Sequence, residues 1–360
     1  MTYTVFNMKF NDFLVGPDDC GRRFDRIIRK FLPNLPISLI YKNIRTGFIR
    51  VNNKKQKQEY KITENDVINI AVVLLAETTT LQQTNLKKNF TLSNLNKLEI
   101  LFKNEHFIVI NKPYDIPVQG TNKTDVSLDR IIQSNYQPLS NSLTFTPGPL
   151  HRLDKRTTGV LVFSQSLKGA QWFSKAIKSK LIQKEYISLL CGHLQEKVRW
   201  CDYIDDSYEY ENDDNFRKIK IIAEQDSLNT GKMAITNAEP LAYAQITTLG
   251  KTVPVTLTHF SIETGRTHQI RAQSAFHGYP VAGDIAYTTT EYTNIKLKSF
   301  GIHDSKIKTP IPEFLLHAIQ LKIPENNKLG LPKKITAPIP PFFSKLLDTY
   351  FASYDFSLIL

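Results

Sequence analysis

One short segment gathers groups that could do chemistry. Residues 151–163 read His-Arg-Leu-Asp-Lys-Arg-Thr-Thr-Gly-Val-Leu-Val-Phe, so the single carboxylate of Asp154 lies among cations at the start of an apolar strand. A neighbouring arginine favours the charged form of a carboxylate, even when the group is partly buried. An ionised, oriented aspartate can act as a nucleophile or a base. From local chemistry alone, a structural salt bridge at a strand start explains the segment better.

The segment resembles the signature H-R-L-D-x-x-T-[ST]-G of the RluA family of pseudouridine synthases. Five further stretches resemble motifs of that family and occur in the expected order. They are residues 100–120 with an Asn-Lys-Pro turn, Lys184-Glu185-Tyr186, residues 231–236, residues 264–271 continued by 277–284, and Leu316-His317-Ala318. Six motifs in order are far more specific than one. Within the family, the sequence resembles most the branch that modifies large-subunit ribosomal RNA.

The resemblance implies a role for each matched residue. Asp154 matches the nucleophile that attacks a flipped-out uridine, at the sugar C1′ or on the base, and Arg271 matches the basic residue that pairs with it. Tyr186 matches the ring that stacks on the target uracil. Arg152 matches the arginine that fills the space left by the flipped base, and Ile270 supplies an apolar wall. Flipping costs a few kcal/mol of stacking, which a filling group offsets.

The implied reaction is an isomerisation. No group enters or leaves and no redox step occurs, so no cofactor and no metal is expected. The histidines are scattered, without the spacing of metal ligands. We expect His151, His268 and Lys112 to be substrate or RNA contacts, although Lys112 in the Asn-Lys-Pro turn fits a structural role equally well.

Two departures from the family pattern concern loop geometry. Arg156 stands where an acid is usual, and Asp115 stands where the family often has glycine. Neither removes a reacting group. We hypothesise that the two residues compensate each other electrostatically.

The N-terminal region is strongly basic. Residues 21–61 hold twelve Lys and Arg against two acids, a net +10 of the total of +12. A run of charge is usually a solvated face. Here, however, two predicted short helices, Gly47 and the stretch Arg50-Val51-Asn52 to Lys61 resemble an S4 RNA-binding domain. This resemblance implies RNA contacts that include Arg45, Arg50, Lys54 and Lys57.

The pattern along the chain predicts an α+β protein of two domains. We expect an S4-like domain with an N-terminal arm over residues 1–76, a linker over 77–97, and a catalytic domain of the pseudouridine synthase fold over 98–360. That fold is a mixed, largely antiparallel sheet with flanking helices. Residues 205–230 have little apolar periodicity and are predicted to form an excursion loop.

The sequence therefore favours a pseudouridine synthase that acts on 23S ribosomal RNA or the assembling large subunit. One alternative is a synthase acting on tRNA. Another is a non-catalytic RNA-binding or ribosome-assembly factor, and a third is a glycosidase-like enzyme, which would usually need a second carboxylate. We expect a cytoplasmic monomer without a membrane partner, since there are three cysteines without zinc-like pairing and no signal peptide.

Overall fold

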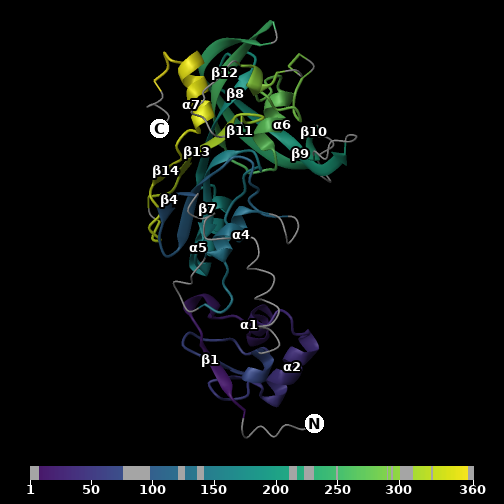
Figure 1. Cartoon of the computed structure of the whole chain (residues 1–360), viewed down its shortest axis with the longest axis vertical. Coiled ribbons are helices and arrows are strands. Elements are labelled where there is room, and N and C mark those ends of the chain that lie inside the picture. Colours follow the sequence, from purple (N-terminus) through teal and green to yellow (C-terminus); the bar gives the residue numbers. More distant parts are fainter. Residues whose placement is uncertain are drawn as a thin grey trace. The chain divides into compact units, whose positions relative to one another are not determined.

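The computed structural model describes residues 8–75, 98–120, 126–135, 142–210, 217–222, 231–248, 250–289, 291–292, 295–300, 311–325 and 327–355. Contacts divide the chain into two compact units (Figure 1). The first contains Met1–Lys97, Asp129–Gly148 and Ser164–Gln171, and the second contains Leu98–Leu128, Pro149–Phe163 and Trp172–Leu360. The predicted linker, residues 77–97, lies outside the described residues.

The N-terminal residues of the first unit form two helices and a small sheet. Helices α1 (Phe24–Phe31) and α2 (Ile37–Thr46) pack with antiparallel strands in the order β1 (Phe10–Leu14), β3 (Val67–Ala71), β2 (Ile49–Val51). Helix α2 ends where the sequence predicts, because Gly47 adopts φ +85 and donates its N–H to Asn43 and Ile44. Asn52 and Asn53 make the following turn, both with positive φ.

The second unit is built on an eleven-stranded mixed sheet. Nine strands follow the order β10-β9-β11-β12-β8-β13-β7-β5-β4, while β14 pairs with β13 and β6 pairs with β7. Their bounds are β4 Glu99–Lys103, β5 Phe107–Lys112, β6 Gly148–Pro149, β7 Thr158–Ser164, β8 Gln183–Cys191, β9 Val198–Tyr210, β10 Arg217–Ile222, β11 Gly231–Thr248, β12 Lys251–Ile262, β13 Leu316–Lys322 and β14 Lys334–Thr336.

Strand β13 occupies a central place although it forms late in the chain. It runs antiparallel to β8 on one side and parallel to β7 on the other, where His317 lies opposite Thr158 and Ala318 opposite Gly159. A side chain at Gly159 would overlap the backbone of Ala318, and the residue has φ +111. Glycine there permits a very close approach of the two strands.

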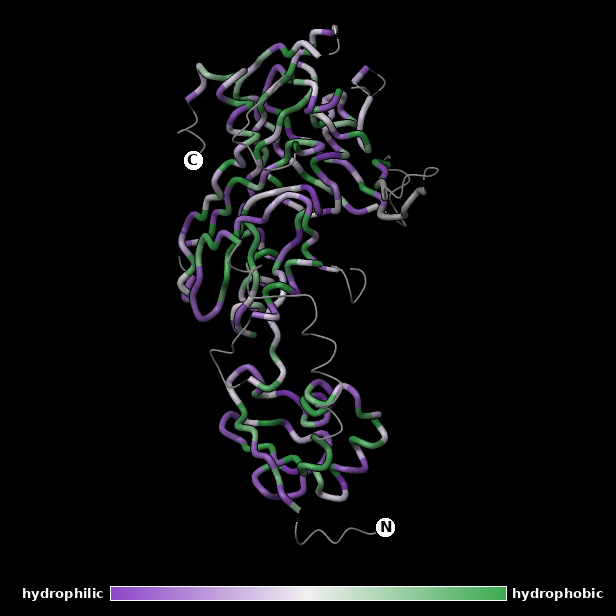
Figure 2. Tube along the Cα trace, viewed as in Figure 1, coloured by the Kyte–Doolittle hydropathy of each residue, from purple (hydrophilic) through white to green (hydrophobic). Residues whose placement is uncertain are grey.

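Further helices occur along the chain, and most of α4 belongs to the first unit. The helices are α4 (Leu128–Ser134), α5 (Leu167–Lys178), α6 (Gln269–Phe276) and α7 (Pro341–Tyr350). One apolar cluster lies where α7 packs near β8 and β12, and another lies where α5 meets β5 and β7. Figure 2 shows hydrophobic stretches along the strands and hydrophilic residues at many turns. Within the described ranges, no helix combines the length and the apolar character needed to cross a membrane.

The α+β class is confirmed, and one local prediction is wrong. Residues 205–230 were expected to form a loop, but β9 continues to Tyr210 and β10 pairs back against it. The polar and acidic end of β9 hides the pattern, although Ile219 and Ile221 alternate on β10 and pack in an apolar cluster with Ile204.

Candidate active site

The loop between β6 and β7 carries Asp154. The loop backbone forms a turn, in which Thr157 N–H donates to the Asp154 carbonyl at 3.1 Å. Leu153 is buried beside it and anchors the loop. The Asp154 side chain is 22% exposed, so its carboxylate reaches a cleft from a fixed backbone.

Arg271 on α6 meets this carboxylate. Its Nη1 donates to Asp154 Oδ2 at 3.1 Å, while Nε and Nη2 donate to the two oxygens of Asp284 at 2.6 and 3.0 Å. Arg271 and Asp284 are 7% and 1% exposed. Burial alone would lower the pKa of Arg271, but the hydrogen bonds and charge of Asp284, with the charge of Asp154, raise it above its ordinary value. The guanidinium is therefore a permanent cation with one edge aimed at Asp154.

The start of α6 is fixed by two residues. Gln269 Oε1 accepts from Arg266 N–H at 3.0 Å and Thr264 Oγ1 at 2.8 Å, while its Nε2 donates to the Ile235 carbonyl on β11 at 3.0 Å. His268 adopts the left-handed conformation with φ +50. Such strain in a non-glycine residue is typical of functional sites.

His268 also faces the carboxylate of Asp154, and its imidazole is uncharged. Its Nε2 lies 3.8 Å from Asp154 Oδ2, and its Nδ1 lies 2.9 Å from the Tyr287 hydroxyl. Burial lowers the pKa of His268 below its ordinary value, and the nearby charge of Asp154 opposes this shift only in part. The imidazole is thus neutral at pH 7.

Tyr186 and Ile270 form apolar walls of the cleft. Tyr186 lies on β8 and is 6% exposed, and Ile270 on α6 is 4% exposed. Both line the cleft with Asp154 and Arg271. Burial first, and then the charge of Asp154, raises the pKa of Tyr186 above its ordinary value. The phenol therefore stays protonated, and its ring can serve as a surface for a planar group.

Two cations stand at the mouth of this cleft. Arg152 and Arg266 line it, and both are exposed. The structure thus brings together Asp154, Arg271, Tyr186, Arg152, Ile270 and His268, as the sequence predicts.

His151 and Lys112 lie beneath the loop rather than at the cleft surface. The ring of His151 stacks on Phe173, its Nε2 accepts from Val162 N–H at 3.2 Å, and burial lowers its pKa to about 3. Lys112 is fully buried, and its Nζ donates to the carbonyls of Lys155 at 2.7 Å and Pro113 at 2.9 Å. The Lys112 contacts support the backbone of the loop, and the His151 contact ties the start of the loop to β7.

The two departures from the family pattern have separate partners. Lys155 pairs with Asp115 at 3.1 Å, and Arg156 pairs with Glu313 at 2.6 Å. The hypothesis that Arg156 and Asp115 compensate each other is therefore not needed. Asp115 has φ +62, which explains why glycine suits this position and why aspartate is tolerated there.

The sequence did not single out Asp284 and Tyr287. Asp284 holds two nitrogens of Arg271, and the ring of Tyr287 lies 5.0 Å from the guanidinium. A signal did exist, because an arginine inside a buried helix needs a carboxylate partner. The partner itself could not be chosen, since thirteen residues separate it from Arg271 along the chain.

The predicted RNA contacts of the first unit lie on its surface or near it. Arg45, Lys54 and Lys57 are exposed, whereas Arg50 is partly buried, with its guanidinium over the Phe10 ring. In the part of the chain that the structure describes, no group of three His, Cys, Asp or Glu side chains is arranged to hold a metal ion.

Comparisons with known proteins assign the chain to a family. Residues 106–276 match the family model described as RNA pseudouridylate synthase. The chain is 31% identical over 340 residues to ribosomal large subunit pseudouridine synthase C of Buchnera aphidicola, with 93% of this chain and 96% of that protein covered. It is 28% identical over 345 residues to the protein of the same name from Pasteurella multocida, with coverage of 95% and 94%.

A solved structure has a similar fold. The human protein RNA pseudouridylate synthase domain containing 4 superposes with a TM-score of 0.50 at 23% identity, over 71% of this chain and 93% of that one.

Replacing Asp284, which supports Arg271, should lower the stability of the protein. Asp284→Asn removes the charge that compensates a buried guanidinium, so the free energy of unfolding should fall by about 3 kcal/mol. Glu313→Gln is the control, because it breaks the more exposed pair with Arg156 and should cost less than about 1 kcal/mol. Urea denaturation of both variants measures the difference. Equal losses would show that Asp284 does not compensate Arg271.

Lys112 gives a stability effect that depends on pH. Burial lowers its pKa from 10.5 to about 7, against the opposing charges of Asp154 and Asp115. From about pH 7 upward to the ordinary lysine value, the unfolded chain binds more protons than the folded chain, so stability gains as pH rises. This gain is absent below pH 7.

Lys112→Met removes that gain. The wild-type free energy of unfolding minus that of the variant should therefore increase between pH 7 and pH 9, by up to about 1.4 kcal/mol per pH unit. Urea denaturation at several pH values measures it. Lys333→Met, at an exposed lysine, should show a flat difference. A flat difference for Lys112→Met as well would mean that the buried amine keeps an ordinary pKa.

Proposed function

Because this chain belongs to the RNA pseudouridylate synthase family, we propose that it converts specific uridines of large-subunit ribosomal RNA to pseudouridine, with Asp154 as the nucleophile. The observation that carries the proposal is the pair of ionic hydrogen bonds that link Asp154, Arg271 and Asp284 at the cleft. The curated relatives named for the large ribosomal subunit align over nearly the whole chain, which supports that substrate.

The chemistry conserves atoms. Asp154 attacks the flipped nucleotide at C1′ or on the base, the bond between N1 and C1′ breaks, and the uracil turns within the cleft. C5 then bonds to C1′, the bond that Asp154 had formed breaks and frees the carboxylate, the proton on C5 is lost, and N1 gains a proton. No group enters or leaves overall. Arg271 acts by holding the carboxylate at a fixed angle, since its other nitrogens are occupied by Asp284.

The surroundings of Asp154 suit an uncharged nucleobase. Tyr186 and His268 are both uncharged at pH 7, because burial raises the pKa of the phenol and lowers that of the imidazole. A uracil released from its sugar can therefore turn against apolar and neutral polar walls without binding strongly to one orientation. We assign Tyr186 to stacking on the uracil and Ile270 to the opposite wall.

The exposed cations at the mouth of the cleft suit the RNA backbone. We assign Arg152 to the gap that the flipped uridine leaves, where a guanidinium offsets part of the lost stacking. Arg266 is exposed beside it and can meet a phosphate.

We also propose that residues 1–76 form an S4-like RNA-binding domain, joined by a linker over 77–97 to a catalytic domain over 98–360. The two short helices, the small antiparallel sheet and the exposed Arg45, Lys54 and Lys57 support this assignment. Such a domain adds affinity through phosphate contacts, in keeping with a monomer that works in the cytoplasm on ribosomal RNA.

Mapping of pseudouridine in cellular RNA tests the function. In cells without the gene and in cells with Asp154→Asn, the same few uridines of large-subunit ribosomal RNA should lose the modification. With purified enzyme, the rate should fall more than about a thousandfold, as expected when a covalent nucleophile is removed. Asp115→Asn, at an exposed aspartate near the loop, should retain the marks.

Each other outcome has a definite meaning. Marks that vanish in the deletion but persist with Asp154→Asn would assign the nucleophile elsewhere. Loss confined to tRNA would change the substrate. Unchanged marks with impaired ribosome assembly would favour the non-catalytic binding factor.

Salt dependence tests the N-terminal domain. Replacing Arg45, Lys54 and Lys57 together by Gln should weaken RNA binding and reduce the slope of log affinity against log salt by about 2 to 3, roughly one for each phosphate that the variant no longer neutralises. Fluorescence titration at several salt concentrations measures the slope. The same replacement at three exposed lysines of the second unit, Lys197, Lys251 and Lys333, should leave it nearly unchanged. An equal reduction of the slope in both triple variants would show that the effect comes from the net charge of the protein and not from the N-terminal domain.

A further inference from the structure

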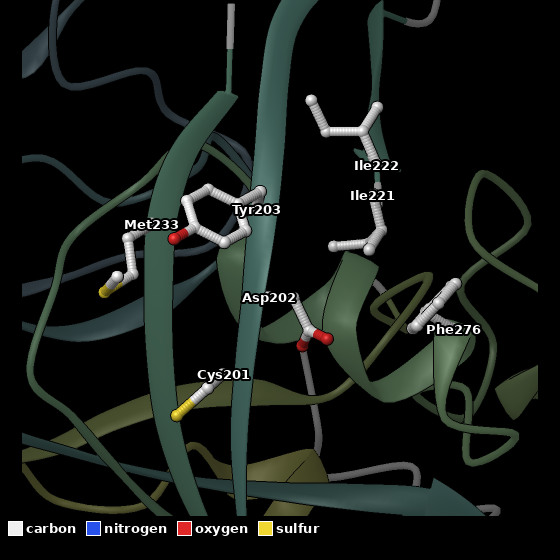
Figure 3. A pocket seen from close by; sticks show the side chains of 7 residues that line it. All are labelled: Cys201, Asp202, Tyr203, Ile221, Ile222, Met233 and Phe276. Carbon is white, nitrogen blue, oxygen red and sulfur yellow. The ribbon is translucent and has the colours of Figure 1, made fainter. Parts of the chain in front are cut away.

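A second cavity lies at the other end of α6 from Arg271. Its volume is about 480 Å³, within the range of sites that hold a small organic group. Among its walls are Asp202 and Tyr203 on β9, Ile221 on β10, Met233 on β11 and Phe276 at the end of α6 (Figure 3). No role in the reaction described above requires it.

The walls are unusually apolar for a surface. Phe276 is 61% exposed and Met233 is 46% exposed. Large apolar side chains around a hollow are typical of a contact surface. An open aromatic face such as that of Phe276 is a surface on which nucleobases stack.

One polar group is built into this apolar surface. The Asp202 side chain is 11% exposed, and both of the hydrogen bonds that the structure gives its carboxylate end on Oδ2. Gln273 Nε2 lies 2.6 Å from Oδ2, and His277 Nε2 lies 3.0 Å from it. In Figure 3 the carboxylate points toward the side on which Ile221 and Phe276 lie.

These partners hold the carboxylate rigidly. Gln273 is fully buried, and it also donates to the Ala234 carbonyl and accepts from Thr236 Oγ1 at 2.6 Å. The His277 ring stacks on Trp200 with centroids 4.9 Å apart. Among the described residues Oδ1 accepts no hydrogen bond, and Asp202 lines the cavity, so Oδ1 is a fixed acceptor there.

The same helix lines both the cavity and the candidate active site. Helix α6 lines the active-site cleft with Ile270 and Arg271 and the cavity with Phe276, five residues further on. Five residues of helix span about 7.5 Å, close to two steps of a stacked nucleic-acid strand. Exposed Arg266 lines the cleft, and its Nε donates at 3.0 Å to the carbonyl of Met233, which lines the cavity. An arginine there can hold the phosphates between two bases.

We propose that this cavity is a second base subsite, which binds an RNA base within about two nucleotides of the target uridine and selects one with an amino group. The base stacks on Phe276 and donates its amino hydrogen to Asp202 Oδ1. Cytosine, adenine and guanine each carry such an amino group. Uracil has none, and its N3–H donor lies between two carbonyl oxygens that the carboxylate repels. The inference rests on the proposed function, because it assigns a specificity determinant to the same reaction.

The test uses full-length enzyme and short RNAs copied from a uridine that wild-type enzyme modifies. The two nucleotides on each side of the target are changed in turn to each of the four bases, and kcat/KM is measured. At one of these positions, wild-type enzyme should disfavour uracil by about tenfold or more, the size of one good contact to a base edge.

Asp202→Asn should change this preference without removing activity. Gln273 needs an acceptor, so the amide oxygen takes the place of Oδ2 and the amide nitrogen faces the cavity. The variant should then lose the discrimination against uracil or reverse it, at that position only. Phe276→Ala should lower kcat/KM about tenfold for every base at that position. Leu181→Ala, at another exposed apolar residue, should change nothing.

The outcomes separate the two proposals. If wild-type enzyme modifies no uridine, the proposed function fails and this subsite fails with it. If wild-type enzyme is active but Asp202→Asn lowers all rates equally, or leaves the preference unchanged, then Asp202 only supports α6 and the subsite is refuted.

Discussion

Everything in the cleft depends on a buried guanidinium shared between two carboxylates. Taking a charged group out of water costs several kcal/mol, which only well-placed counter-charges offset. Asp284 satisfies two nitrogens of Arg271, and the rings of Tyr287 and Phe314 cover the faces of its plane. The one remaining edge points to Asp154. The carboxylate of Asp154 is therefore oriented by a partner that cannot turn away.

Burial suppresses the charge of the other groups near Asp154, and this leaves Arg271 as the main ionic partner of the carboxylate. A second fixed cation would compete with Arg271 for the carboxylate and pull it out of line. Burial keeps Tyr186 protonated and His268 uncharged. Lys112 lies close enough for its charge to interact with Asp154, but its hydrogen bonds go to backbone carbonyls of the loop and its pKa falls to about 7. The exposed cations stand at the mouth of the cleft, where a polyanion would meet them.

The sequence predicted the parts of this site that short motifs encode. Asp154, Arg271 and Tyr186 lie in one cleft although 117 residues separate the two charged partners. The end of α2 at Gly47 was also predictable, because a left-handed cap is a local requirement. Asp284 was not, because its pairing depends on tertiary contacts. The inward packing of His151 and Lys112 was hidden for a similar reason, since their residue types suit RNA contact as well as support of a loop. The hairpin of β9 and β10 was missed because the polar, acidic end of β9 hides the short alternation of Ile219 and Ile221 on β10.

The place of β13 in the sheet has a consequence for biosynthesis. In the described strand order, β13 separates β7, which follows the Asp154 loop, from β8, which carries Tyr186. Without it, the sheet falls into β4, β5 and β7 on one side and β8 to β12 on the other. Synthesis runs from the N-terminus, so these two groups of strands emerge before Leu316 does. A nascent chain thus cannot bring the carboxylate of Asp154 and the ring of Tyr186 together in the complete sheet until β13 has been made. The candidate active site is therefore assembled from strands made earlier in synthesis, once this later strand lies between them.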